Sequence, residues 1–167
     1  WGEYGAMQWR DIPTFINMYD NSRAIHIYRD PRSVLSSWKS LSFAHDGLYL
    51  NTIFNWIDSM NHIEKYKREL SSDRYLPLCY EEIMAEPKSH VHKICDFIGV
   101  NFEEEMLIPE TWHGRLPQEF LINPRSAHQG KNIRGFSTSR TKNWINNLEE
   151  WEIAIIEYLC HDQMKQY

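Results

Sequence analysis

An arginine and a serine eight positions apart are the side chains in this sequence with the clearest chemical potential. Arg29 directly follows a short apolar run, and Ser37 lies about two turns into the helix expected to follow it. A guanidinium is a planar fork of N–H donors that matches phosphate oxygens, and a serine hydroxyl adds one more donor. The pair would therefore suit an anion, most naturally a phosphate monoester.

The elements around this pair are those of a parallel α/β unit. Residues 24–28 are mostly apolar without alternation, which is typical of a buried strand in a parallel sheet. Asp30 and Pro31 are a good N-cap and first helical residue, so a helix is expected from about residue 31 to 41. Ligands of open α/β sheets bind beyond the carboxyl ends of the strands. Arg29 is thus expected at a ligand-binding edge.

A purely structural interpretation of the same residues stays open. Asp30 would simply cap the helix, and Arg29 or Arg32 would pair with a surface carboxylate. Short motifs such as Arg-Asp-Pro often match by chance, so the motif alone does not decide between the two interpretations.

Further along the chain, periodicity predicts alternating helices and strands. A long amphipathic helix is expected over 48–70, with its apolar face formed by Leu50, Ile53, Phe54, Ile57 and Met60. Residues 75–80 predict a second strand, although Pro77 cannot donate to a ladder. Another helix is expected from about residue 87, with Gly99 as its terminator. Strand, helix, strand, helix with short connections predicts an α/β architecture.

The C-terminal third combines an irregular segment with a helix. Residues 109–142 are rich in Gly, Pro, Asn and Ser and lack periodicity, as functional or disordered loops do. A single helix is expected over about 144–164, with a buried stripe formed by Leu148, Trp151, Ile155 and Leu159.

Composition excludes several classes of protein. The 167 residues suffice for one ordinary domain, and 18 Lys and Arg against 23 Asp and Glu give a net charge of −5, so no nucleic-acid partner is expected. No stretch approaches the roughly 18–20 apolar residues of a membrane span, which predicts a soluble protein. Three well-separated cysteines predict reduced core thiols rather than disulfides. No metal site is predicted, because His90 and His92 would face different directions on a helix.

Taken together, the motifs resemble the sulfotransferases that use 3′-phosphoadenosine-5′-phosphosulfate (PAPS). In that family a strand ends in Arg, and a Ser eight positions later helps it hold the 3′-phosphate; Arg29 and Ser37 keep this spacing. The family's next strand ends in Tyr-Glu, as Tyr80-Glu81 does, and its next helix closes with a tripeptide similar to residues 97–99. The resemblance covers roughly residues 22–160.

The resemblance implies roles for further residues. Tyr80 matches the residue that contacts the adenosine part of the cofactor. Arg140 and Lys142 belong to a loop before a Trp that folds over the nucleotide, and are candidate phosphate contacts. Glu3 would be the acceptor base, although Tyr4 stands where the family has Lys.

The resemblance also implies a fold and an activity. The fold is a three-layer, P-loop-like α/β sulfotransferase fold with a parallel sheet, present in part. The N-terminal strand and 5′-phosphosulfate loop match nothing in 1–167. Residues 1–167 would form a single partial domain, in which 109–143 covers cofactor and substrate. The expected reaction moves a sulfuryl group from PAPS to a hydroxyl or amine of a carbohydrate, lipid or small molecule, leaving adenosine 3′,5′-bisphosphate.

Two other functions remain open, together with the compartment. One is a non-catalytic nucleotide-binding or interaction domain on the same fold. The other is a P-loop kinase-like phosphotransferase, which would need a Gly-Lys phosphate loop and Mg²⁺ carboxylates. Without the upstream loop, this chain is expected to bind adenosine 3′,5′-bisphosphate weakly and to turn over poorly. Thiol content favours the cytoplasm, with the Golgi lumen as the alternative; the sequence specifies neither acceptor nor oligomeric state.

Overall fold

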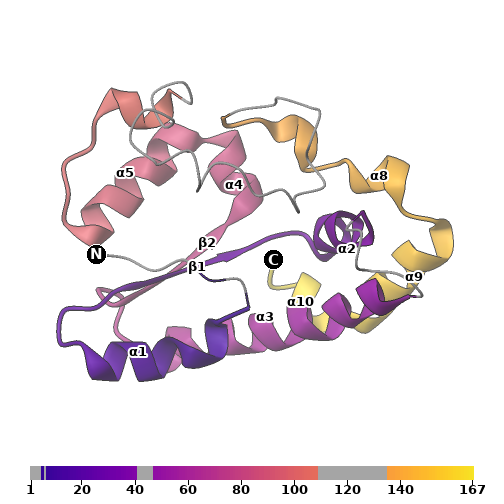
Figure 1. The fold of residues 1–167 in the computed structure, drawn as a ribbon, viewed down its shortest axis with the longest axis horizontal. Helices are drawn as coiled ribbons and strands as arrows, with labels where there is room; N and C mark the ends of the chain where they lie inside the picture. The colour runs from indigo at the N-terminus through magenta and orange to yellow at the C-terminus, as the bar shows by residue number, and fades with distance from the viewer. Residues whose placement is uncertain (1–4, 6, 41–46, 109–134) are drawn as a thin grey trace.

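The centre of the structure is a two-stranded parallel sheet (Figure 1). The structure, a computed structural model, describes residues 5, 7–40, 47–108 and 135–167, apart from the side chain of Arg140. Strand β1 (Ala24–Tyr28) pairs with β2 (Tyr75–Cys79), and Pro77 lies opposite His26. Both expected strands and their parallel pairing are confirmed, which confirms the α/β class.

Helices cover both faces of this sheet, as the alternation of its side chains requires. Helices α1 (Ile12–Met18) and α3 (Asn51–Glu69) lie along one face, and α4 (Tyr80–Ala85) and α5 (Pro87–Ile98) lie along the other (Figure 1). Ala24 and Tyr75 pack against the first pair of helices, whereas Ile25 and Leu76 belong to the cluster beneath the second pair. Opposed residues therefore point to the same face, with the period of two that strands impose.

The helix that follows β1 begins as the sequence predicts. Helix α2 (Pro31–Lys39) starts after Asp30, whose side chain accepts a hydrogen bond from the backbone N–H of Arg32. Gly99 ends α5 in the left-handed conformation with φ 78°, where the absence of a side chain removes the strain. The structure thus confirms Asp30 as an N-cap and Gly99 as a terminator.

The expected helix over 48–70 is confirmed with a different apolar face. A short 3₁₀ turn (Leu48–Leu50) leads into α3, and Phe54 is 62% exposed rather than buried. The buried apolar positions of α3 are Ile53, Trp56, Met60, Ile63 and Tyr66. The prediction placed Phe54 on the apolar face from helical spacing, whereas the sheet and α2 contact the face one position away. The described residues before 109 also contain α1, α4 and two further 3₁₀ turns, Trp9–Asp11 and Glu104–Leu107.

The prediction of one C-terminal helix with a stripe through Trp151 is wrong. Helices α8 (Trp144–Asn147), α9 (Glu150–Leu159) and α10 (His161–Met164) replace it, with extended backbone at Leu148. Glu149 and Glu152 form a capping box that starts α9 afresh. This restart turns the helix, so its buried stripe consists of Leu148, Glu152, Ile156 and Cys160. Trp151, Ile155 and Leu159 are exposed to 51%, 37% and 39%.

The remaining global features concern cysteines and hydropathy. All three cysteines are buried and free, which confirms the expected thiols. Of the helices in the described part of the chain, none is long and apolar enough to cross a membrane. Most of the irregular segment expected over 109–143 lies outside the described residues.

A fully buried carboxylate joins α2 to α9. Glu152 accepts hydrogen bonds from Lys39 Nζ at 2.7 Å, from the Tyr49 hydroxyl at 2.5 Å and from the backbone N–H of Glu149 at 2.7 Å. Burial alone would raise the pKa of Glu152, but these donors outweigh it and hold that pKa below its usual value. Burial and the neighbouring carboxylate raise the pKa of Tyr49 to about 12. The network therefore keeps Glu152 charged at neutral pH.

Removing this carboxylate should destabilise the fold strongly. In Glu152→Ala the Lys39 ammonium and Tyr49 hydroxyl lose their buried partner, and breaking such a pair costs about 3–5 kcal/mol. Urea unfolding would measure the loss, with the exposed neighbour Glu150→Ala as control. Equal unfolding midpoints for the two variants would contradict the assigned role of Glu152.

A buried histidine lies on the α3 face of β1. His26 is 7% exposed, and its two ring nitrogens lie 2.9 Å from the Tyr75 hydroxyl and 2.9 Å from Ser59 Oγ. The Trp9 ring stacks on it at 6.5 Å. Burial, with a smaller contribution from the charge of His62, lowers the pKa of His26 to about 4. His26 is thus a hydrogen-bonded core residue, as its position inside a strand predicts.

Its lowered pKa predicts that acid weakens the fold. The unfolded chain takes up a proton on His26 near pH 6.5 and the folded chain only near pH 4. The stability it contributes is therefore complete above pH 6.5 and falls by about 3 kcal/mol as the pH drops to 4. Urea unfolding at pH 7.5 and 5.0 would show this loss in the wild type and a smaller one in His26→Gln. Identical pH dependence of the two proteins would refute the assignment.

Candidate functional site

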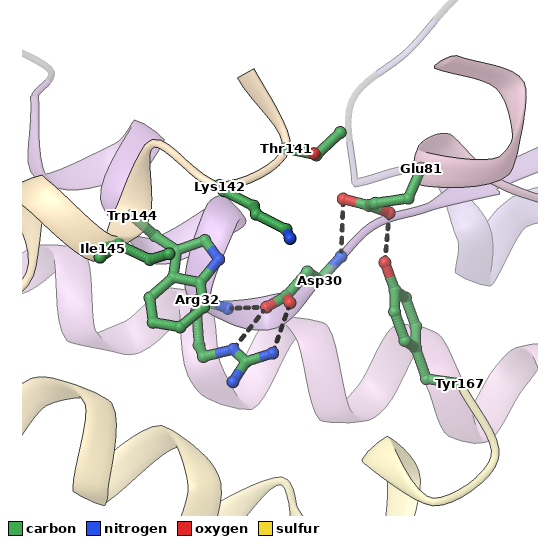
Figure 2. Close-up of a pocket in the computed structure, with 8 residues that line it drawn as sticks. All are labelled: Asp30, Arg32, Glu81, Thr141, Lys142, Trp144, Ile145 and Tyr167. Carbon is green, nitrogen blue, oxygen red and sulfur yellow. Dashed lines mark hydrogen bonds and ion pairs between the residues drawn. The ribbon is translucent and has the colours of Figure 1, made fainter. Parts of the chain in front are cut away.

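A pocket opens at the carboxyl ends of the two parallel strands (Figure 2). Its volume is about 330 Å³. It lies between the start of α2, the start of α4 and the segment leading into α8, and is lined by Asp30, Arg32, Glu81, Thr141, Lys142, Trp144, Ile145 and Tyr167. This is the edge of the sheet at which the sequence predicts a ligand.

Arg29 lies beside this pocket, fixed by two consecutive residues of α4. Its Cζ lies 4.6 Å from the centre of the Tyr80 ring, and its Nε lies 3.6 Å from Glu81 Oε1. Its backbone carbonyl accepts a hydrogen bond from Trp56 Nε1 at 2.7 Å. Two residues predicted for the site, Arg29 and Tyr80, are therefore in contact, because their strands pair in register.

A second arginine, Arg32, lines the wall of the pocket. Arg32 Nε and Nη2 donate to the two Asp30 oxygens at 3.1 and 2.7 Å, and Nη1 reaches Glu157 at 3.0 Å. Its Cζ also lies 4.2 Å from the centre of the Trp144 ring, against which the guanidinium packs (Figure 2). The carboxylate pairing of the structural interpretation is present, for Arg32 with Asp30 and for Arg29 with Glu81.

Ser37 lies on α2, one turn beyond Ser33. Ser33 Oγ donates to the Thr141 carbonyl at 2.8 Å, so this face of α2 turns towards the segment that leads into α8. Ser37 is half-buried, and its carbonyl accepts a hydrogen bond from Ser40 Oγ at 2.7 Å. Its joint action with Arg29 on one ligand remains a prediction.

Lys142 enters the pocket from the opposite side. Figure 2 shows its ammonium directed inward, between Trp144 and the carboxylates of Asp30 and Glu81. Arg140 ends the preceding 3₁₀ turn (Thr138–Arg140), and its side chain is outside the described part. Glu3, the expected acceptor base, also lies outside the described residues.

Sequence reasoning did not assign two residues of this site. Glu81 receives the Tyr167 hydroxyl on Oε2, and burial together with this hydrogen bond raises the pKa of Tyr167. The Tyr167 ring also packs edge-on against Tyr28 at 5.7 Å. Glu81 could have been found, because it follows a strand at the ligand-binding edge. No local pattern marks Tyr167, since its contacts depend on the path of the last helices.

Fold and site define an α/β domain with a parallel sheet and, at the strand ends, a pocket lined by both cations and carboxylates. In the described segments no three His, Cys, Asp or Glu side chains are grouped so as to hold a metal. The family model described as "Sulfotransferase family" matches residues 6–104, which is more than half of the chain. The chain therefore belongs to the sulfotransferase family.

Curated relatives agree with this membership. Sulfotransferase 2A2 of Mus musculus is 29% identical over 161 residues, covering 86% of this chain and 56% of the relative. Protein-tyrosine sulfotransferase 2 of Gallus gallus is 21% identical over 135 residues, covering 78% of this chain and 36% of the relative. The matched part thus spans about half the length of these relatives or less.

A solved structure shares the fold. The sulfotransferase domain from the curacin biosynthetic pathway superposes with a TM-score of 0.62 at 19% identity, covering 93% of this chain and 59% of that one. This likeness confirms the α/β fold with its parallel sheet.

Proposed function

We propose that this chain binds the adenosine 3′-phosphate end of PAPS, and that the whole protein transfers the sulfuryl group to a hydroxyl or amine acceptor. One observation carries the proposal. The Arg29 guanidinium lies at the end of β1 against the Tyr80 ring, beside a pocket that Lys142 enters. A cation and an aromatic ring at a strand end suit a phosphate joined to a nucleoside.

The charges in the pocket support an anionic ligand. Uncompensated carboxylates would repel a phosphate, but Arg32 pairs with Asp30, and Arg29 lies against Glu81. Lys142 then adds positive charge to a wall whose carboxylates are already balanced. The donor set of Arg29, Lys142 and the serine face of α2 therefore fits a phosphate better than a neutral sugar.

The proposed residues would act by anchoring and alignment. PAPS supplies an activated sulfuryl group at its 5′ end, and transfer is an in-line displacement akin to phosphoryl transfer. Arg29, Ser37 and Lys142 would grip the 3′-phosphate, remote from the bond that breaks. Fixing that end orients the donor relative to the acceptor, which lowers the entropic barrier. A general base contributes about 10²–10⁴-fold, and Glu3 is proposed for this role.

The acceptor class is proposed more broadly than the donor. The resemblance favours a carbohydrate, lipid or other small molecule with a hydroxyl or amine. The relative named as a protein-tyrosine sulfotransferase adds a phenolic hydroxyl of a protein to the candidates. Because the matched part spans about half of these relatives or less, activity is proposed for the whole protein, and nucleotide binding for this chain.

Calorimetry with adenosine 3′,5′-bisphosphate tests the nucleotide site. Wild type should bind it more tightly than adenosine 5′-monophosphate, which lacks the 3′-phosphate. Arg29→Ala should weaken binding roughly 10–100-fold, since hydrogen bonds to charged groups are worth about 1.5–3 kcal/mol. Ser37→Ala should weaken it about 2–10-fold, as expected for a neutral donor.

Arg23→Ala is the matched control, because Arg23 flanks the opposite end of β1 and bonds the carbonyls of Asp73 and Ile98. This variant should bind both nucleotides like wild type. Failure of the wild type to prefer the 3′-phosphate, or unchanged binding by Arg29→Ala, would refute the proposed site.

A further inference from the structure

We propose that Glu81 is a positioning residue, whose carboxylate fixes the Arg29 guanidinium and thereby sets the preference for a 3′-phosphate. The inference rests on the proposed nucleotide site. Neither the sequence motifs nor the resemblance to sulfotransferases assigns Glu81 a role. Glu81 lies in the first turn of α4, directly after Tyr80, so two consecutive residues contact the Arg29 guanidinium.

The Glu81 carboxylate is itself held from several directions. Oε1 accepts the backbone N–H of Asp30 at 3.4 Å and lies 3.6 Å from Arg29 Nε. Oε2 accepts the Tyr167 hydroxyl and the Cys79 thiol, the latter at 3.5 Å (Figure 2 shows the Asp30 and Tyr167 contacts). The side chain is 23% exposed. Contacts from both strand ends hold the Glu81 carboxylate in place. Its ion pair with Arg29 therefore restrains the arginine side chain.

Two contacts restrain the Arg29 guanidinium. Its Cζ lies over the Tyr80 ring, 4.6 Å from the ring centre, and Glu81 lies at its buried Nε edge. A guanidinium held at its centre by a ring and at one edge by a carboxylate has little freedom to turn. The pair with Glu81 lies on the Nε side of the guanidinium, so holding this edge also sets the direction of the Nη groups, whose N–H donors suit an anion. The ordering of Arg29 is thus completed before the ligand binds.

A competing role for Glu81 predicts the opposite sign. If its carboxylate merely competes with the ligand for Arg29, its removal should tighten nucleotide binding. If it positions Arg29, its removal should loosen binding, and only for ligands that carry the 3′-phosphate. The quantity to measure is therefore the ratio of the dissociation constants for adenosine 5′-monophosphate and adenosine 3′,5′-bisphosphate.

The experiment is a double-mutant cycle on this ratio, measured by calorimetry. Glu81→Ala should lower the ratio about 5–10-fold while leaving the affinity for the 5′-monophosphate unchanged, the loss expected when one oriented hydrogen bond is weakened. Glu81→Gln, which keeps an oxygen facing Arg29 and Asp30, should retain more of the preference. Arg29→Ala combined with Glu81→Ala should match Arg29→Ala alone, because the two act as one unit.

The adjacent Glu82→Ala is the matched control, since the Glu82 side chain is 67% exposed on the same helix turn. It should leave the ratio unchanged. Additive losses in the double variant, an equal loss of affinity for both nucleotides, or tighter binding by Glu81→Ala would overturn the inference. If Glu81→Ala does not fold, Glu81→Gln provides the test. A ratio of dissociation constants equal to or above that of wild type overturns the inference. A modest loss of affinity confined to the bisphosphate supports it.

The same data separate this inference from the proposed function. If the wild type shows no preference for the 3′-phosphate, or Arg29→Ala leaves that preference intact, the nucleotide site itself is wrong and the role of Glu81 is rejected with it. If Arg29→Ala abolishes the preference and Glu81→Ala does not change it, the nucleotide site stands and only the positioning role is rejected.

Discussion

The parallel register of β1 and β2 is the constraint on which the site depends. Tyr28 lies opposite Cys79, so the residues that follow each strand, Arg29 and Tyr80, emerge side by side. They are separated by about fifty residues of sequence, and only the ladder brings them together. A shift of either strand by one position would send its side chains to the other face of the sheet. The alternating packing of Ala24 and Ile25 against different helix layers opposes such a shift.

Charge balance is the second constraint, and it follows from the first. Joining two strand ends also joins their following carboxylates, Asp30 and Glu81, at the mouth of one pocket. Asp30 is buried and Glu81 is half-buried, and two such carboxylates at close quarters would be unfavourable without nearby cations. Arg32 forms an ion pair with Asp30, and Arg29 forms one with Glu81. Pairing with a carboxylate does not prevent Arg29 from taking its proposed role towards the ligand, so the structural and the functional interpretations of Arg-Asp-Pro are compatible.

Sequence reasoning found the features that local patterns determine. The strand before Arg29, the cap at Asp30 and the terminator Gly99 depend on neighbouring residues only, and the structure confirms them. Features that depend on distant packing were missed. The stripe through Trp151 failed because Glu152, a charged residue, takes the buried position by pairing with Lys39. Hydrophobic periodicity cannot identify a buried carboxylate whose partner lies 113 residues away.

Helix α2 connects these parts, because it carries Ser37 and also holds the segment that delivers Lys142. Its polar face binds that segment at successive turns: Ser33 bonds the Thr141 carbonyl, Ser36 accepts from Asn147, and Lys39 reaches Glu152. The two sides of the pocket are therefore tied through one helix rather than through the sheet. A phosphate between them would bind to groups whose separation α2 has already fixed, so that little ordering of the chain would remain to oppose binding. The buried charge of Glu152, which does not line the pocket, thus contributes to the same geometry as the arginine at the end of β1.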